Sequence, residues 1–235
     1  MTTSQQKDAP SCTSHPQDEG PDSLPDKLTS VYHYCGYALN ITRDFGAGIG
    51  VASAVWEAAR FLCQYFESMK ITFTGKKVIE LGSGTGLVGI LAVLLGGDVT
   101  LTDLPLVLNQ IKDNVSANIP PAELHRTKVH ALLWGEDQKF FPNDYDIILG
   151  SDIVYLECGY PSLIQTLQDL SNENTVIYLS SNIMHELGVD RFYNDLITQY
   201  FDCEVVSRSS DKYINVFKIT KRCPDPGDKN KESKA

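Results

Sequence analysis

The stretch VIELGSGTGLVG, Val78–Gly89, predicts a buried strand that runs into a glycine-rich turn and then into a helix. Within it, the acidic Glu80 lies two positions before the first glycine, Gly82. A second acid, Asp103, ends the next apolar run about 20 residues further on. In open parallel α/β sheets, a turn and an acid with this spacing bind an adenosine-bearing cofactor at the carboxyl ends of the strands, with the acid on the ribose. The stretch therefore predicts an α/β fold and a cofactor site.

Strand-like and helix-like patterns alternate on both sides of this stretch, as in βαβ units with a parallel sheet. The expected strands are 77–81, 99–102, 128–133, 145–152 and 175–181, and the expected helices are 50–70, 87–95, 105–118, 160–170 and 189–200. The segment 201–220 contains two strand-like runs joined by a polar turn, which predicts a terminal antiparallel hairpin. The segment 31–44 predicts a separate short hairpin with its turn near Cys35 and Gly36. The predicted fold class is therefore α/β, with a mostly parallel sheet of seven strands.

The composition indicates one folded domain between two polar tails. Residues 1–29 and 223–235 are poor in apolar side chains and are expected to be disordered, which leaves 30–222 as the domain. The net charge of −10 argues against binding to nucleic acid or to anionic membranes, which needs clustered Lys and Arg. No leader or membrane span is evident, so we expect a cytoplasmic protein. We also expect it to be a monomer. The six cysteines form no C-x-x-C pair, which predicts free thiols and no metal site.

Two cofactors fit the glycines. Gly84–Gly89 matches G-x-G-x-x-G, which is typical of dinucleotide-binding sheets, and Asp103 would bind the ribose there as well. Against an NAD-dependent oxidoreductase stand the terminal hairpin, the short chain after Asp103, and an extra glycine that makes Glu80–Gly86 read E-x-G-x-G-x-G. That pattern is typical of class I S-adenosylmethionine-dependent methyltransferases. Their cofactor passes close to the backbone, where a Cβ at Gly82 or Gly84 would obstruct it.

A second candidate site follows the strand at 145–152. An acid and a phenol, Asp152 and Tyr155, come close together there, and the carboxyl ends of strands are where open α/β sheets place their active sites. Both side chains would emerge beside the cofactor. The spacing alone equally allows Asp152 to cap a helix and Tyr155 to be a packed aromatic residue.

Three segments together resemble the methyltransferase-like 21 group of protein lysine methyltransferases. They are the D-x-x-Y signature at Asp152–Tyr155, ALLWGED at Ala131–Asp137 and VASAVWEAARFL at Val51–Leu62. The similarity extends over roughly 34–221. It implies a Rossmann-like class I methyltransferase that uses S-adenosylmethionine, releases S-adenosylhomocysteine and methylates a lysine of a folded protein.

The resemblance also implies a substrate. Cys35–Gly46, Phe73–Leu91 and Ile148–Glu157 most resemble the member of the group that acts on translation elongation factor 1-alpha. Sister members act on Hsp70 chaperones and on the valosin-containing AAA ATPase. These remain alternative substrates.

The same resemblance implies roles for individual residues. The cofactor site would comprise Trp56 near the methionyl end, Glu80, Gly82, Ser83 and Gly84 in the loop motif, Asp103 on the ribose, Trp134 near the adenine, and Ser151 and Asp152 completing the pocket. Asp152 and Tyr155 would be catalytic, since Asp152 can orient the lysine amine while Tyr155 shapes the channel to it. No metal is implied.

Three further functions remain open from the residues alone. A small-molecule methyltransferase could use the same sheet, and a non-enzymatic binding module could retain the fold. Intact Asp103, Asp152 and Tyr155 count against the binding module. A nucleic-acid methyltransferase is disfavoured by the acidic charge and by the lack of an N/D-P-P-Y/F motif after the strand at 145–152.

Overall fold

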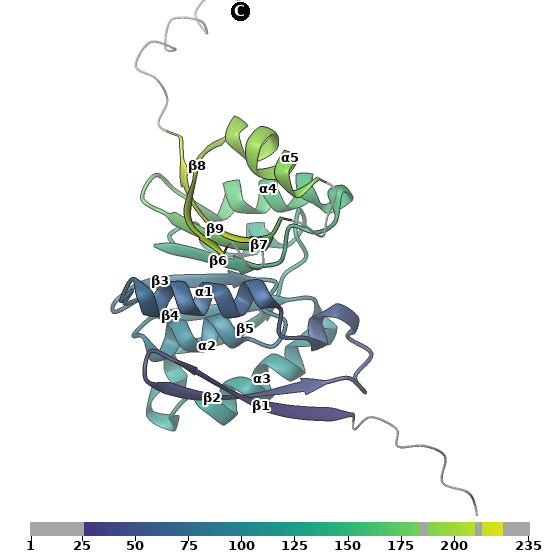
Figure 1. Ribbon diagram of the computed structural model, residues 1–235, viewed down its shortest axis with the longest axis vertical. Helices are drawn as coiled ribbons and strands as arrows, with labels where there is room; N and C mark the ends of the chain where they lie inside the picture. The colour runs from purple at the N-terminus through teal and green to yellow at the C-terminus, as the bar shows by residue number, and fades with distance from the viewer. Residues whose placement is uncertain (1–25, 184–187, 210–212, 223–235) are drawn as a thin grey trace, which may run out of the picture.

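The computed structural model describes residues 26–183, 188–209 and 213–222, and at its centre lies a seven-stranded sheet in the order β5-β4-β3-β6-β7-β9-β8 (Figure 1). Its strands are β3 (Lys77–Leu81), β4 (Asp98–Asp103), β5 (Thr127–Ala131), β6 (Ile147–Ser151), β7 (Val176–Asn182), β8 (Phe201–Ser209) and β9 (Ile214–Lys221). The five strands β3 to β7 are parallel, and β9 is antiparallel to β7 and β8 on either side of it. The predicted mostly parallel sheet with a terminal hairpin is confirmed.

Helices cover both faces of the sheet (Figure 1). They are α1 (Glu57–Ser68), α2 (Leu87–Leu94) and α3 (Leu108–Asn118) on one face, and α4 (Tyr160–Leu170) and α5 (Val189–Arg191) on the other. Successive residues of β3 show why: Val78 packs into the core with α1 to α3, whereas Ile79 packs into the core with α4. Because neighbouring strand residues point to opposite faces, a strand that is apolar throughout requires helices on both sides.

The N-terminal hairpin forms a second sheet of two strands, β1 (Lys27–Tyr34) and β2 (Tyr37–Asp44). Its turn lies at Cys35 and Gly36, as predicted, and both residues have positive φ, 54° and 80°. The hairpin packs on α2 and α3 instead of joining the central sheet (Figure 1). It therefore adds a layer outside the helices of one face.

The first strand corrects the expected boundary of the N-terminal tail. Residues Lys27–Thr29 fall within the segment predicted to be disordered, yet they pair with 42–44 in the hairpin. Thr29 and Thr42 also share a hydrogen bond between their hydroxyls at 2.8 Å. Buried and exposed residues alternate only in the second half of β1. The first half is mostly polar and shows no apolar periodicity from which a strand could be predicted. The rest of the predicted tails, 1–25 and 223–235, lies outside the described residues.

The helix expected at 50–70 is shorter than predicted. Gly50–Ser53 is a 3-10 turn, and the chain is extended at Ala54 and Trp56, with ψ of 151° and 150°, before α1 begins at Glu57. The apolar periodicity of the sequence continues through this break, so the pattern predicts one continuous helix. The first turn of α1 makes a long hydrogen bond to a residue 94 positions along the chain, described below.

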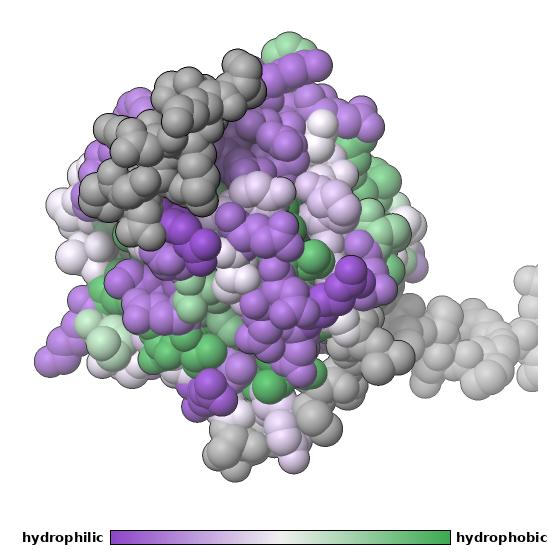
Figure 2. Space-filling view, turned by 90° about the horizontal axis from the view of Figure 1, so that it is seen from above, coloured by the Kyte–Doolittle hydropathy of each residue, from purple (hydrophilic) through white to green (hydrophobic). Residues whose placement is uncertain are grey.

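The segment expected as a helix at 189–200 is helical but irregular. It passes from α5 into a π turn at Phe192–Leu196 and a 3-10 turn at Ile197–Gln199. In a view from above Figure 1, the described surface is mostly hydrophilic, with hydrophobic residues in small separate groups (Figure 2). Among the described residues, no helix has the length and apolar character needed to span a membrane. The four described cysteines, Cys35, Cys63, Cys158 and Cys203, are free thiols.

Candidate active site

The glycine-rich loop between β3 and α2 turns sharply at two positions. Gly82 and Gly84 have φ of 61° and 56°, a left-handed backbone that residues with a Cβ rarely adopt. A Cβ at Gly82 would also lie 2.8 Å from Ile153 Cγ2 and 3.4 Å from the ring of Trp134. The loop is therefore packed against the segments that follow β5 and β6, and Gly82 is required both by conformation and by space.

Ser83 holds this loop on the neighbouring strand β4. Its N–H donates to the carbonyl of Thr102 at 2.9 Å, and its Oγ accepts from the Thr102 N–H at 3.1 Å. The same hydroxyl also hydrogen bonds to Glu80. The side chain is buried and occupied by these contacts, so Ser83 maintains the shape of the loop.

Glu80 lies beneath the loop, with only 1% of its surface exposed. Its Oε2 accepts a hydrogen bond from the Gly89 N–H in α2 at 3.1 Å, and a Cβ at Gly89 would come within 2.5 Å of that oxygen. Burial raises the pKa of Glu80 to about 8, although hydrogen bonds from Ser83 and Gly89 act in the opposite direction. A largely protonated Glu80 therefore links β3 to α2 and supports the loop from behind.

Asp103 stands at the carboxyl end of β4, beside the loop. Its Oδ2 accepts a hydrogen bond from the Gly84 N–H at 2.8 Å, and its Oδ1 accepts one from the Leu104 N–H at 2.7 Å. Burial raises the pKa of Asp103, and the two amide hydrogen bonds oppose that rise. Each carboxylate oxygen has a further lone pair, so the group can accept hydrogen bonds from two neighbouring hydroxyls.

Asp152 follows β6 and has a left-handed backbone, with φ of 51°. Its Oδ1 accepts a hydrogen bond from the Asn182 N–H at the end of β7 at 3.0 Å, and its Oδ2 accepts a long one, 3.4 Å, from the Ala58 N–H in the first turn of α1. A carboxylate at a helix N-terminus is favoured by the unpaired amides and the helix dipole. Asp152 thus joins β6, β7 and α1, and Asp is one of the few residues other than glycine that adopt this backbone region.

Tyr155 and Ser151 flank Asp152. Tyr155 is 38% exposed, and its pKa is raised chiefly by burial and further by the charge of Asp103. The segment after β6 also meets the glycine loop, because a Cβ at Gly82 would lie 2.8 Å from Ile153 Cγ2. Ser151 is the last residue of β6 and is half-buried opposite Ser180 of β7.

The two tryptophans lie in different parts of the site. Trp134 is half-buried against the core around α4, and its ring is the nearest aromatic surface to Gly82. Trp56 is 47% exposed, donates its Nε1–H to the carbonyl of Val51 at 3.0 Å and immediately precedes α1, whose first turn contacts Asp152. The structure thus brings Trp134 to the glycine loop and Trp56 to the Asp152 side of the site.

Sequence analysis missed two buried amides of α3 that contact the loop. Gln110 Nε2 donates to the carbonyl of Gly84 at 3.1 Å, and Asn114 Nδ2 donates to the carbonyl of Thr85 at 2.9 Å. Both side chains are buried, with 6% and 1% exposed. The available signal was their spacing, since amides four residues apart share one helix face.

Comparison with protein families decides the class to which this site belongs. A family model described as lysine methyltransferase matches residues 36–198. This chain belongs to the lysine methyltransferase family. The resemblance found in the sequence is confirmed, and the chain is an S-adenosylmethionine-dependent enzyme rather than an NAD-dependent oxidoreductase.

Curated relatives agree with this family. The chain is 51% identical over 222 residues to EEF1A lysine methyltransferase 3 of Xenopus tropicalis, which covers 88% of this chain and 98% of the relative. Identity to the Mus musculus protein of the same name is 50%, covering 83% of each chain. Protein N-lysine methyltransferase METTL21A of Danio rerio is 45% identical, covering 82% of this chain and 88% of the relative.

Solved structures show the same fold at low sequence identity. A Thermus thermophilus 16S rRNA N2 G1207 methyltransferase in complex with AdoMet and guanosine superimposes with a TM-score of 0.62 at 16% identity, over 87% of this chain and 53% of that chain. The glycopeptide N-methyltransferase MtfA with sinefungin gives a TM-score of 0.57 at 12% identity, over 71% and 95%. The predicted class I methyltransferase fold is confirmed.

Proposed function

We propose that this lysine methyltransferase acts on translation elongation factor 1-alpha. The observation that carries the proposal is the 51% identity, over nearly the full length of both chains, to a relative named as an EEF1A lysine methyltransferase. Identity to the METTL21A relatives is lower, at 36% to 45%. We therefore favour the elongation factor over the substrates of the sister proteins.

The donor set of the site fits S-adenosylmethionine. Asp103 would accept hydrogen bonds from the ribose hydroxyls, the backbone at Gly82–Gly84 would contact the amino-acid end, and the half-buried ring of Trp134 would pack near the adenine. Trp56 and Ser151 would complete the pocket. When bound, this cofactor supplies a methyl group carried by a sulfonium. Glu80 would hold the loop in place without touching the cofactor, because it lies behind the loop.

Lysine must be neutral to accept a methyl group. With a pKa near 10.4, removing its proton costs about 4–5 kcal/mol at pH 7, and a desolvated channel lowers that cost. Asp152 would orient the amine through its carboxylate, and Tyr155 would form a wall of the channel. Support for these roles comes from the position of both residues directly after β6, at the carboxyl edge of the sheet, and from the contact of that segment with the glycine loop. The enzyme's contribution is then mainly one of positioning.

Exposed apolar side chains around this site favour a protein as the substrate. They lie in loops that follow the strands or precede α1, and they are Val51, Trp56, Leu104, Leu106, Leu133, Tyr155 and Leu156, each 38% to 57% exposed. Exposed apolar side chains that gather at one place, here the carboxyl edge of the sheet, are typical of interaction sites, whereas singly scattered ones are not. A rim of this kind suits a folded partner better than a small polar metabolite.

The direct test is methyl transfer to recombinant folded elongation factor 1-alpha. We expect one lysine to gain the mass of one or more methyl groups, and we expect short lysine peptides to be poor substrates. The matched control is Asp152→Asn, which should bind S-adenosylhomocysteine but transfer little. Methylation of an Hsp70 chaperone or of the AAA ATPase instead would overturn the substrate but not the family, and labelling of a small molecule alone would overturn the protein substrate altogether.

We further propose that the enzyme works as a cytoplasmic monomer and binds neither nucleic acid nor membranes. The net charge of −10 supports this proposal. Gel filtration with light scattering and fractionation of cells would test it.

A further inference from the structure

Helix α3 presents three amide side chains to the open edge of the N-terminal hairpin. Gln110, Asn114 and Asn118 are four residues apart and lie on one helix face. Four helical residues advance by about 6 Å and two strand residues by about 6.7 Å. The two repeats therefore match, and successive amides along the helix meet alternate residues along β2.

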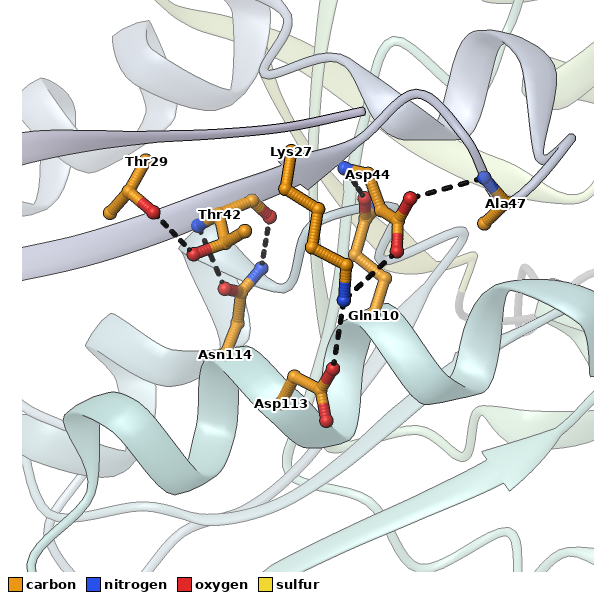
Figure 3. Close-up of polar contacts among 8 residues, drawn as sticks. All are labelled: Lys27, Thr29, Thr42, Asp44, Ala47, Gln110, Asp113 and Asn114. Atoms are coloured by element: carbon orange, nitrogen blue, oxygen red, sulfur yellow. Dashed lines mark hydrogen bonds and ion pairs between the residues drawn. The ribbon is translucent and has the colours of Figure 1, made fainter. Parts of the chain in front are cut away.

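The amides take the place of a neighbouring strand. Asn114 accepts from the Thr42 N–H at 2.8 Å and donates to the Thr42 carbonyl at 2.9 Å, as Figure 3 shows. Asn118 does the same with Asn40, at 2.7 and 2.9 Å. At the near end of the row, Gln110 Oε1 accepts from the Asp44 N–H at 2.8 Å. The hairpin is thus held on α3 by side chains in place of strand pairing.

Two of the three amides also reach the glycine loop. Gln110 Nε2 donates to the carbonyls of Gly84 at 3.1 Å and Ala52 at 2.8 Å, and Asn114 Nδ2 donates to the carbonyl of Thr85 at 2.9 Å. Asn118 bonds to Asn40 and to the carbonyl of Asn114 on its own helix, and no bond from it to the loop is among the described contacts.

The loop residue that Gln110 holds is also the one that Asp103 holds. Gly84 donates its N–H to Asp103 at 2.8 Å while its carbonyl accepts from Gln110. The peptide groups on both sides of Gly84 are therefore fixed by two different elements, the end of β4 and helix α3. A change at Gln110 acts on the conformation of Gly84 directly.

We propose that Gln110 and Asn114 are positioning residues for the cofactor loop and couple its conformation to the N-terminal hairpin. The proposal rests on the assignment of Gly82–Gly84 to cofactor binding. Neither amide needs to touch the cofactor. Each side chain hydrogen bonds both to a β2 peptide and to a loop carbonyl. Fixing the conformation of the hairpin therefore stabilises the conformation of the loop, and the reverse holds as well.

The test compares Gln110→Ala with Asn118→Ala in the full chain. Calorimetry with S-adenosylhomocysteine gives the dissociation constant, and thermal unfolding without ligand gives the stability. We expect Gln110→Ala to weaken binding about tenfold, which corresponds to about 1.4 kcal/mol. Asn118→Ala should lower the melting temperature and leave the dissociation constant within about twofold of the wild-type value. Equal loss of affinity in both variants would overturn the proposal.

A second variant and a second measurement guard against simple unfolding. Gln110→Glu retains an oxygen for the Asp44 N–H but, when ionised, has no donor for Gly84 or Ala52. It should keep the hairpin and still lose affinity. In wild-type protein, S-adenosylhomocysteine should slow hydrogen exchange at the amide of Asp44, which Gln110 holds, and this slowing should disappear in Gln110→Glu.

The outcomes separate the two proposals. If the wild-type chain does not bind S-adenosylhomocysteine, the cofactor assignment and the proposed function fail together. If it binds, but Gln110→Glu binds equally well and shows the same protection of the hairpin, the coupling alone is wrong.

Discussion

Asp103 and Asp152 are both carboxylates that follow a parallel strand, but they are held in different ways. Asp103 bonds to amides within its own motif, those of Leu104 next to it and of Gly84 in the adjoining loop. Asp152 bonds to amides from β7 and α1, and its own backbone is in the left-handed region. The first acid is placed by one βαβ unit, whereas the second is placed by the assembly of three elements.

This difference suggests a division of labour. A carboxylate fixed against the glycine loop is suited to binding the cofactor, because loop and acid form together. A carboxylate held between the end of β7 and the start of α1 is fixed by elements other than the glycine loop. It is suited to orient a second molecule, the substrate. Mutation of the two acids should therefore affect different steps.

The largest effect is expected from Asp152→Asn. Asparagine tolerates the left-handed backbone and keeps an acceptor oxygen, so the fold should survive while the negative charge that faces the amine is lost. We expect turnover at saturating cofactor to fall by about 10²–10³-fold. Initial rates of methyl transfer to the folded elongation factor measure this. Near-normal turnover would remove the catalytic role and would leave Asp152 as a helix cap.

A pH-dependent effect of intermediate size is expected from Glu80, the third acid of the site. Its pKa is about 8 in the folded protein, against 4.5 as its ordinary value. The folded state therefore binds the proton more tightly, so the stability due to Glu80 is fully present below pH 4.5 and is lost as the pH rises through 8.

Between pH 6 and pH 8 the loss should be about 2 kcal/mol. Urea unfolding at a series of pH values measures it, with Glu80→Gln as the control. The amide can still accept the Gly89 N–H but does not ionise, so the stability of the variant should change less over this range. Parallel curves for the two proteins would show that Glu80 is not the group responsible.

Asp103→Asn should have a smaller effect than the two preceding changes, and the effect should be on the binding of the cofactor. The substitution weakens charge-assisted hydrogen bonds to the ribose, each worth roughly 1.5–3 kcal/mol, so affinity for S-adenosylhomocysteine should fall at least about tenfold. Calorimetry measures the affinity, and an unchanged melting temperature would show that the loop remains folded. A loss of turnover at saturating cofactor as severe as that of Asp152→Asn would break the proposed division between the two acids.

The smallest effect is expected at the start of the hairpin, which is also held by contacts between distant elements. Deleting residues 1–29 removes Lys27, whose Nζ lies 3.1 Å from Asp44 Oδ2 and 3.8 Å from Asp113 Oδ2, and the bond from Thr29 to Thr42 (Figure 3). We expect the melting temperature to fall by about 2–4 °C. Deleting only residues 1–25 should leave it unchanged. Equal melting temperatures would show that these three strand residues add nothing to stability.

Much of the fold was readable because its signals are local. The strand at Lys77–Leu81 and the helix at Tyr160–Leu170 were predicted with the observed bounds, since an apolar strand and an amphipathic helix each show their own periodicity. The break before Glu57 was not predicted. The first turn after this break bonds to Asp152, which is distant in sequence, and no pattern within the helix shows that contact.

The sequence by itself determined the loop and its acid. The positive φ of Gly82 and Gly84 needs glycine, and Asp103 ends the strand beside them, so residue type and spacing alone predicted this half of the site. Only the tertiary structure decided the other half: that Glu80 lies behind the loop, that Asp152 meets α1, and that Gln110 and Asn114 join the loop to the hairpin. The physical reason is that hydrogen bonds between side chains and distant backbone groups depend on how the elements pack, and a buried amide in a helix shows no partner in the sequence.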